Sequence, residues 1–271
     1  MVKPTQEPVV MLTAVDLDFL SPSGESLPTL RGIDMTISPG EFVALVGPTG
    51  CGKSTTLGLI SGLLRPTRGR VELFGREVTG IDSRLGSVFQ ADALFPWRTV
   101  IGNVMAGPSF RGIDKGEASE LARQWLARVG LAGFESYYPH QLSGGMRKRV
   151  ALAQTFINQP QILLMDEPFS ALDIHTRNHM YQEMLKLWSE TNAAIIFVTH
   201  DLDEAVSLAD TVFVMSRRPA HIIRRHPIDL ARPRHLDDLR YQQRFIEQAR
   251  AIWQDLKNEI VDETQTESIP S

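Results

Sequence analysis

The sequence predicts an α/β fold with a mainly parallel core sheet, an antiparallel β subdomain and an inserted α-helical subdomain. Short strands punctuated by Gly, Pro and Ser fill the first forty residues, which is typical of antiparallel structure. Apolar runs such as FVALV (42–46) and ILLMD (162–166) alternate with helical segments, and such alternation produces a parallel sheet covered on both faces. Between about residues 92 and 159 the pattern is helical throughout.

The antiparallel part comes first along the chain. Residues 9–20 are expected to form an edge strand, followed by a turn-rich stretch at 21–28 and a second strand pair around 30–41. The apolar run at 42–46 is expected to be a buried strand that enters a glycine-rich loop and then a helix, the first half of a βαβ unit. Short strands at 69–78 and 87–90 complete this region.

The helical insert contains an amphipathic segment with apolar residues at Leu121, Trp125, Leu126 and Val129, which matches a 3.6-residue period. After it, strands and helices are expected alternately at 162–166, 174–190, 193–200, 201–210 and 211–216, then a β return at 221–230 and an amphipathic helix at 238–258. The predicted divisions are an N-terminal extension (1–8), a core (9–91 and 160–230), the α-helical subdomain (92–159), and a C-terminal helix and tail (231–271).

Composition limits the function. A chain of 271 residues holds one large α/β domain with an appendage, or two small domains. Its 28 Lys and Arg against 32 Asp and Glu exclude broad electrostatic binding of nucleic acid, which needs a dense basic face. The single cysteine, Cys51, excludes an internal disulfide. Without a signal-peptide pattern or an apolar stretch of roughly 18 residues, we expect a soluble chain whose membrane role needs a partner.

A phosphate-binding loop is the strongest motif. The segment GPTGCGKST fits G-x-x-x-x-G-K-[ST], in which glycines let backbone N–H groups face phosphate oxygens. The lysine adds positive charge at the β- and γ-phosphates, and the serine hydroxyl binds Mg²⁺. The alternative is a tight glycine turn that binds nothing, and Cys51 is more simply an ordinary loop residue than a nucleophile. The motif predicts a P-loop NTPase whose nucleotide-binding residues are Gly47, Pro48, Thr49, Gly50, Cys51, Gly52, Lys53, Ser54 and Thr55.

Four further residues complete the predicted site. Asp166 ends an apolar strand and is expected to hold Mg²⁺, and Glu167 follows it as a general base for the attacking water. Gln90 ends a short strand, where its amide can reach the metal or its water. His200 ends another strand, where it can bind the γ-phosphate. The alternatives are an exposed Asp-Glu turn and a structural strand-end histidine.

The segment LSGGMRKR (142–149) has no role in a single-chain site. Ser143, Gly144 and Gly145 form a second phosphate-facing helix start without a lysine. A two-fold partner can bring such a turn onto the neighbouring nucleotide.

Together these motifs resemble those of the nucleotide-binding subunits of ABC transporters. GPTGCGKST resembles the Walker A motif, Gln90 the Q-loop, LSGGM the signature, ILLMDE the Walker B motif, SALD (170–173) the D-loop and His200 the H-loop. All six occur in the order of that family, over about residues 9–220. The resemblance implies an ABC ATPase with an ATP-binding core and a helical signature subdomain.

The resemblance also implies cofactors and a second copy. Two chains would sandwich two ATP molecules, each with Mg²⁺, between one Walker A loop and the opposite Ser143–Gly145. Asp173 would lie at the dimer seam, and Phe19 would stack on adenine, although that position is usually Tyr and a core Phe is the alternative. Met146 replaces the usual Gln of the signature and Gln154 a usual Arg, but neither position carries the chemistry.

Finer features resemble the branch that imports nitrate, taurine and aliphatic sulfonates: LFPWRTVIGNV, the LSGGMRKR form and MSRRPAHIIRRHPIDLARPR. In that branch, Phe95, Pro96 and Trp97 would lie in the groove that receives a coupling helix of the permease. The alternative is that the aromatic pair packs inside the helical subdomain and does not contact a partner. The implied setting is the cytoplasmic face of the inner membrane, with a permease and, indirectly, a periplasmic or lipoprotein solute-binding protein. The competing functions are an exporter or lipid-trafficking ATPase, or a soluble ABC ATPase acting on ribosomes or DNA.

Overall fold

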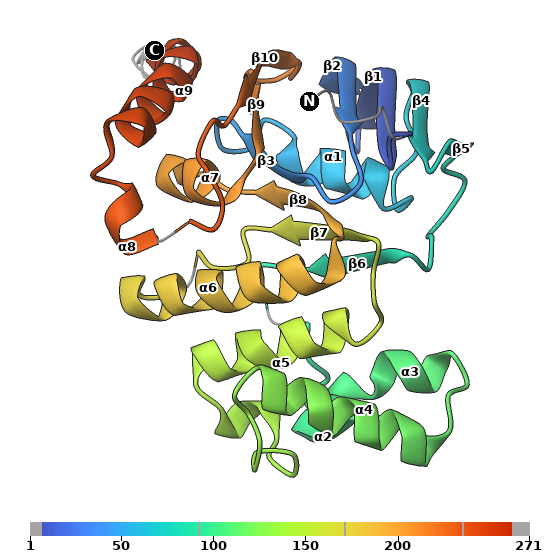
Figure 1. Ribbon diagram of the computed structural model, residues 1–271. Coiled ribbons are helices and arrows are strands. Elements are labelled where there is room, and N and C mark those ends of the chain that lie inside the picture. Colours follow the sequence, from blue (N-terminus) through green and yellow to red (C-terminus); the bar gives the residue numbers. More distant parts are fainter. Residues whose placement is uncertain (1–6, 92, 171, 235, 262–271) are drawn as a thin grey trace, which may run out of the picture. The chain divides into compact units, whose positions relative to one another are not determined.

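The computed structural model describes residues 7–91, 93–170, 172–234 and 236–261 (Figure 1). Most of the predicted N-terminal extension, the C-terminal tail after residue 261 and Ala171 of the D-loop lie outside these residues. The chain divides into two compact units, one formed by Met1–Asp82 with Ala194–Ser271 and the other by Ser83–Ala193. The subdomain boundaries drawn from the sequence differ from this division and stay a prediction.

The first unit contains an antiparallel sheet of β1 (Val10–Leu20), β2 (Ser26–Ile37), β4 (Arg68–Leu73) and β5 (Arg76–Glu77), in the order β2-β1-β4-β5. The prediction of an edge strand at 9–20 was wrong, because β1 pairs with β2 on one side and with β4 on the other. Alternating burial along a strand reports which face is covered, and it does not report how many neighbours the strand has. The expected strand pair around 30–41 is one strand, β2, which begins inside the predicted turn.

A second, mainly parallel group of strands in the first unit consists of β3 (Phe42–Val46), β8 (Ala194–Val198), β9 (Thr211–Met215) and β10 (Ile222–Pro227). β3 pairs in parallel with β8 and β9, and β10 is antiparallel to β9. Every residue of β3, β8 and β9 is buried, which explains their continuous apolar sequences.

Among the described residues of this unit, four helices accompany these strands: α1 (Lys53–Ile60), α7 (Leu202–Leu208), α8 (Leu236–Leu239) and α9 (Gln243–Val261). α1 contacts β4 and β8, α7 packs on β3, and α9 packs on α7, β9 and β10 (Figure 1). The helix predicted at 238–258 is thus two helices, with the break after Leu239.

The second unit contains a parallel pair, β6 (Leu85–Val88) and β7 (Ile162–Asp166), together with most of the helices. Its helix α5 packs against α2, α4, α6 and β6. Trp125 stacks on Phe156 with ring centroids 6.0 Å apart, so the 3.6-residue pattern marks the buried face of α4 as predicted. The helices are α2 (Val100–Val104), α3 (Ala106–Phe110), α4 (Lys115–Arg128), the 3₁₀ turn Pro139–Gln141, α5 (Gly144–Phe156) and α6 (Ile174–Thr191).

The predicted α/β class, with parallel strands, an antiparallel sheet and a run of helices, is confirmed. Two local expectations were wrong: β6 ends at Val88 and β8 at Val198, so Gln90 and His200 lie in the bends that follow rather than at the strand ends. Across the described ranges, every helix is too short or too polar to span a bilayer.

Candidate nucleotide-binding site

The glycine-rich loop connects β3 to α1 in the first unit. Gly52, which precedes α1, has φ of +125°, a conformation that a side chain would strain. A Cβ atom at Gly52 would also lie 2.7 Å from Leu30 Cδ2 of β2. Because Gly52 has no side chain to cap α1, the first-turn N–H groups of this helix are left for an external acceptor such as a phosphate oxygen.

Lys53 is the first residue of α1 and is buried. Its Nζ donates to the carbonyl oxygens of Gly47 at 2.9 Å and Pro48 at 2.8 Å. The ammonium group therefore lies against the start of the loop, within the curve that the motif is predicted to wrap around phosphates. Ser54 is exposed and Thr55 half-buried, so a hydroxyl for Mg²⁺ is present at the same helix start.

Cys51 is buried, and this burial raises the pKa of its thiol despite the opposing charge of Lys53. A raised pKa keeps the thiol protonated, and only a thiolate is a strong nucleophile. Its backbone N–H donates to Pro48 O at 3.3 Å. Cys51 thus has the properties of an ordinary loop residue, as the simpler interpretation expected.

His200 lies at the same edge of the sheet as the loop. β3 and β8 are parallel, with Leu45 opposite Val198, and Thr199 N donates to Leu45 O at 3.3 Å. Since the carboxyl ends of parallel strands meet at one edge, the bend that carries His200 lies beside the start of the loop at Gly47. Within the first unit, the structure therefore brings these two predicted elements together.

The bend at His200 is fixed on both sides by polar contacts that the sequence analysis missed. The hydroxyl of Thr199 donates to the buried carboxylate of Glu204, and its oxygen accepts from Asp201 N at 3.0 Å. Asp201 in turn caps α7 by accepting from Asp203 N at 2.9 Å and Glu204 N at 3.2 Å. The side chain of His200 is exposed between these anchored residues.

Phe19 belongs to the antiparallel sheet of the first unit. It lies opposite Leu27 on β2, three residues before the Leu30 that contacts Gly52. Its side chain is 38% exposed, so the alternative of a core phenylalanine does not describe it. A ring with an open face is available to stack on a base, and adenine binding by Phe19 stays a prediction.

Gln90 and Asp166 are neighbours in the second unit. β6 and β7 are parallel with Val88 opposite Met165, so the bend at Gln90 and the strand end at Asp166 meet at one edge. Gln90 is exposed and Asp166 is half-buried. Carboxylate, amide and hydroxyl oxygens are the ligands that Mg²⁺ accepts, usually one or two from protein together with substrate phosphates. The donor types of Asp166 and Gln90 in this unit, and separately that of Ser54 in the first unit, are ones that this ion accepts.

Glu167 has φ of +44°, which is unusual for a residue other than glycine. Its carbonyl accepts from Ser170 N at 3.3 Å and from the Ser170 hydroxyl at 3.0 Å, so the turn after β7 holds this conformation. Strained backbone positions concentrate at functional sites. The observation supports a functional role for Glu167 more than the alternative of an ordinary exposed turn.

The signature residues begin helix α5. Ser143 caps the helix, its hydroxyl accepting from Met146 N at 3.3 Å. A Cβ atom at Gly145 would lie 2.9 Å from Thr176 Cγ2 on α6, so a larger residue there would force the Thr176 side chain or one of the two helices to shift. Gly144 has more room, and Ser143 is exposed.

Asp173 caps α6 by accepting from His175 N and Thr176 N, both at 3.1 Å. Hydrogen bonds from Thr176 and then His175 lower the pKa of this carboxyl, so it is charged at neutral pH. Its contacts within one chain are those of a helix cap, and the dimer seam stays a prediction.

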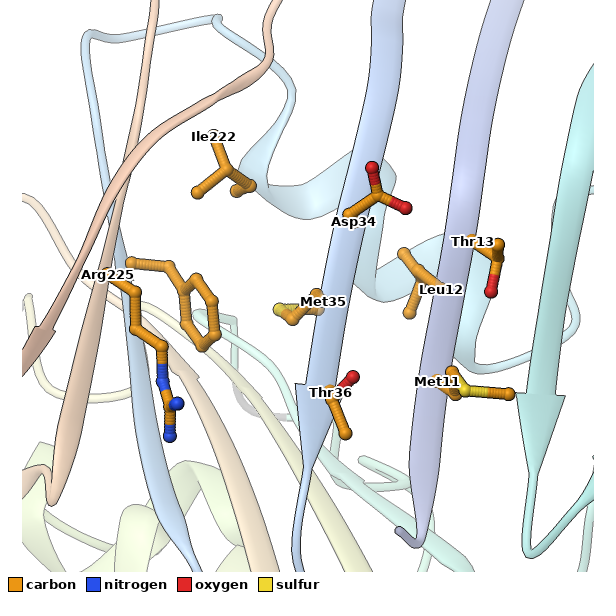
Figure 2. A pocket seen from close by; sticks show the side chains of 9 residues that line it. Met11, Leu12, Thr13, Asp34, Met35, Thr36, Ile222 and Arg225 are labelled. Atoms are coloured by element: carbon orange, nitrogen blue, oxygen red, sulfur yellow. The ribbon is translucent and has the colours of Figure 1, made fainter.

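A surface cavity of about 380 Å³ lies elsewhere in the first unit, between the antiparallel sheet and β9 and β10. Figure 2 shows Met35 of β2 pointing toward the side of Ile222 and Arg225, with Leu12 beside it on β1. None of the residues that line this cavity is predicted to bind nucleotide, so the cavity is separate from the candidate nucleotide-binding site.

Comparison with known proteins shows the family of the chain. Residues 30–170, more than half of the chain, match the family model described as ABC transporter. An uncharacterized ABC transporter ATP-binding protein of Methanocaldococcus jannaschii is 46% identical over 239 residues, 88% of each chain. The taurine import ATP-binding protein TauB of Escherichia coli K12 is 43% identical over 205 residues, 76% of this chain and 80% of TauB.

Solved structures give the same result. A dimeric ATP-binding cassette in a post-hydrolysis state with ADP and Pi has a TM-score of 0.72 at 30% identity, covering 82% of this chain and all of that one. CbiO1 of Clostridium perfringens, part of an ABC transporter complex, has a TM-score of 0.73 at 25% identity, covering 93% and 97%. The chain belongs to the ABC transporter family. Its enzyme class is that of the ABC ATPases, and it resembles the taurine and nitrate importer branch.

Proposed function

We propose that this chain is the ATP-hydrolysing subunit of an importer that moves a small solute, such as nitrate, a sulfonate or taurine, through a separate permease. The supporting observation is a full set of nucleotide-site residues in a chain that is similar to a taurine import ATP-binding protein. The phosphate loop with its buried Lys53 provides the phosphate site of this ATPase.

In the proposed reaction, Lys53 and the N–H groups of α1 neutralise and orient the β- and γ-phosphates. Glu167 accepts a proton from the attacking water, a contribution worth about 10²- to 10⁴-fold in rate. His200 holds the γ-phosphate from the neighbouring bend. Ser54, Gln90 and Asp166 would hold Mg²⁺, and the bound ion would supply positive charge to neutralise the charge that develops on the phosphate oxygens.

A second copy completes each site. Ser143, Gly144 and Gly145 of one subunit would bind the nucleotide held by the phosphate loop of the other, with Asp173 at the seam. The dimeric cassette among the similar structures supports this arrangement. Phe19, with its exposed ring, would receive the adenine.

The contact with the permease is proposed at the loop after Gln90. Trp97 is 72% exposed and its ring lies 5.7 Å from that of Phe95, so the pair presents an aromatic surface. Exposed tryptophans are effective anchors in protein interfaces. The subunit would then work peripherally at the cytoplasmic face of the membrane, with a solute-binding protein acting on the far side.

Co-expression with a candidate permease from the same genome tests the proposal. The two proteins should co-purify, and ATPase of the complex in vesicles should rise when a binding protein loaded with nitrate, taurine or an aliphatic sulfonate is added. If ATP hydrolysis moves solute from the cytoplasmic side of the vesicle membrane to the opposite side, the chain is the subunit of an exporter. Purification with ribosomes or DNA and without any membrane protein would indicate a soluble ABC ATPase and overturn the proposal.

A further inference from the structure

Lys148 is a buried lysine on the signature helix α5, and the proposed chemistry does not use it. Only 4% of the residue is exposed. Its Nζ donates to the backbone carbonyl of Gln90 at 2.6 Å and to that of Phe89 at 3.2 Å. A buried ammonium must be well paired, and hydrogen bonds to a charged donor are stronger than neutral ones.

The two acceptor carbonyls lie beyond the end of the strand, where no ladder hydrogen bonds hold the backbone. β6 ends at Val88, so the β-ladder does not extend to Phe89 and Gln90. Upstream, the same helix already holds β6, because the hydroxyl of Thr155 donates to Ser87 O at 3.4 Å. Lys148 extends this support past the strand end and fixes the backbone that carries the Gln90 amide.

Lys148 also lies close to the signature turn. It is five residues from Ser143 on one helix, which corresponds to about 7.5 Å along the helix axis. A helix transmits displacement as a rigid element, so a push on the turn at Ser143 moves the ammonium and the two carbonyls together.

We infer that Lys148 is a positioning residue that ties Gln90 to the signature helix, so that the metal-facing amide and the signature turn move as one body. This inference rests on the proposed function, because it presumes that Gln90 serves ATP hydrolysis. Engagement of the signature turn by a second subunit would thereby set the position of the Gln90 amide, which would serve Mg²⁺ in the proposed function.

A double-mutant cycle in the full-length chain tests the inference. Lys148→Met keeps the aliphatic stem and removes the donors, Lys148→Arg restores them, and Lys186→Met removes an exposed lysine of α6 as the matched control. The measurements are ATPase as a function of Mg²⁺ concentration and ATP binding in EDTA. Each variant is made in the native background and with Gln90→Ala.

We expect Lys148→Met to lower kcat and to raise the Mg²⁺ concentration at which the rate is half-maximal. The two effects multiplied together should amount to about 10- to 100-fold, which is the loss that a small misplacement of a catalytic group causes. ATP binding in EDTA should change less than about twofold, and Lys148→Arg should restore most of the rate. In the Gln90→Ala background, Lys148→Met should add almost nothing, because the two residues act in one unit.

Equal losses in both backgrounds, or a normal rate in Lys148→Met or in Gln90→Ala, would overturn the inference. If Lys148→Met does not fold, Lys148→Gln, which keeps an uncharged NH₂ donor group, enters the same cycle. Lys53→Ala in the same assay tests the proposed function separately. If Lys53→Ala abolishes ATPase but the effects of Lys148→Met and Gln90→Ala are additive, only the positioning role is overturned. If Lys53→Ala keeps normal ATPase, the proposed function is overturned.

Discussion

Asn103 is hydrogen-bonded to both backbone groups of Phe95. Its amide oxygen accepts from Phe95 N at 2.7 Å, and its amide nitrogen donates to Phe95 O at 3.2 Å. The same nitrogen donates to Arg98 O at 3.2 Å and Thr99 O at 3.0 Å, and Asn103 is fully buried. One side chain on α2 thus fixes the loop that presents Trp97 to solvent.

Asn103→Ala should destabilise the chain by about 1–3 kcal/mol, because it leaves partly buried backbone groups of the loop without the Asn103 amide as a partner. Urea unfolding measures the change, with Asn258→Ala on the exposed side of α9 as a control expected to stay within about 0.5 kcal/mol. Equal stability of Asn103→Ala and Asn258→Ala would show that the loop does not depend on Asn103.

Trp97→Ala should leave the ATPase of the isolated subunit unchanged and weaken its assembly with the permease. The ring is 72% exposed, so its removal costs little folding energy, while truncation of an interface anchor typically costs about 2 kcal/mol or more of binding. Co-purification yield and ATPase of the same preparation give the two measurements. Full assembly with the alanine variant would remove Trp97 from the interface.

Lys53→Ala should reduce ATP turnover by about 10²-fold or more, because the phosphate charge loses its buried counter-ion. Binding of a fluorescent ATP analogue and steady-state ATPase measure the loss. Lys115→Ala, at the exposed start of α4, is the control for a lost lysine charge and should behave as the native chain. Near-normal turnover in Lys53→Ala would invalidate the assignment of the loop.

Glu167→Gln should retain ATP binding and lower kcat by about 10²- to 10⁴-fold, because the amide cannot take the proton of the attacking water. Trapped ATP should hold two subunits together, which size-exclusion chromatography detects as a dimer with ATP and Mg²⁺. The unusual φ of +44° should persist, since glutamine matches the size of glutamate. A variant that stays monomeric with ATP would argue against the paired site.

Arg234→Met should destabilise the first unit by about 3 kcal/mol. The Arg234 guanidinium is buried, and desolvation lowers its pKa to about 10. Its Nη1 donates to Ala209 O at 2.8 Å, Ser207 O at 3.0 Å and Val206 O at 3.2 Å, the carbonyls at the end of α7.

Arg244→Met is the matched control for Arg234→Met. Arg244 forms an exposed ion pair with Asp229 at 3.3 Å, and such pairs contribute at most about 1 kcal/mol. Guanidinium chloride unfolding of both variants gives the comparison. A loss for Arg234→Met no larger than that for Arg244→Met would show that α7 does not need this cap.

Much of the fold and of the candidate site followed from the sequence because the signals are local. The loop at 47–55, the turn at Ser143 and the acidic pair at 166–167 are runs of adjacent residues whose spacing alone predicts phosphate and metal chemistry. Buried strands such as β3 and β8 are continuous apolar segments, and α4 repeats with the helical period.

The tertiary structure decided what depends on residues far apart in the chain. The two neighbours of β1, the junction of Gly47 with the bend at His200, and the contact of Lys148 with Gln90 all join segments separated by tens of residues. The sequence of the signature motif is the same whether the ammonium group of its lysine contacts solvent or a buried carbonyl. The sequence by itself determined the class of chemistry, and the packing of distant segments determined which side chains hold that chemistry in place, because burial and hydrogen-bond partners are properties of the folded chain.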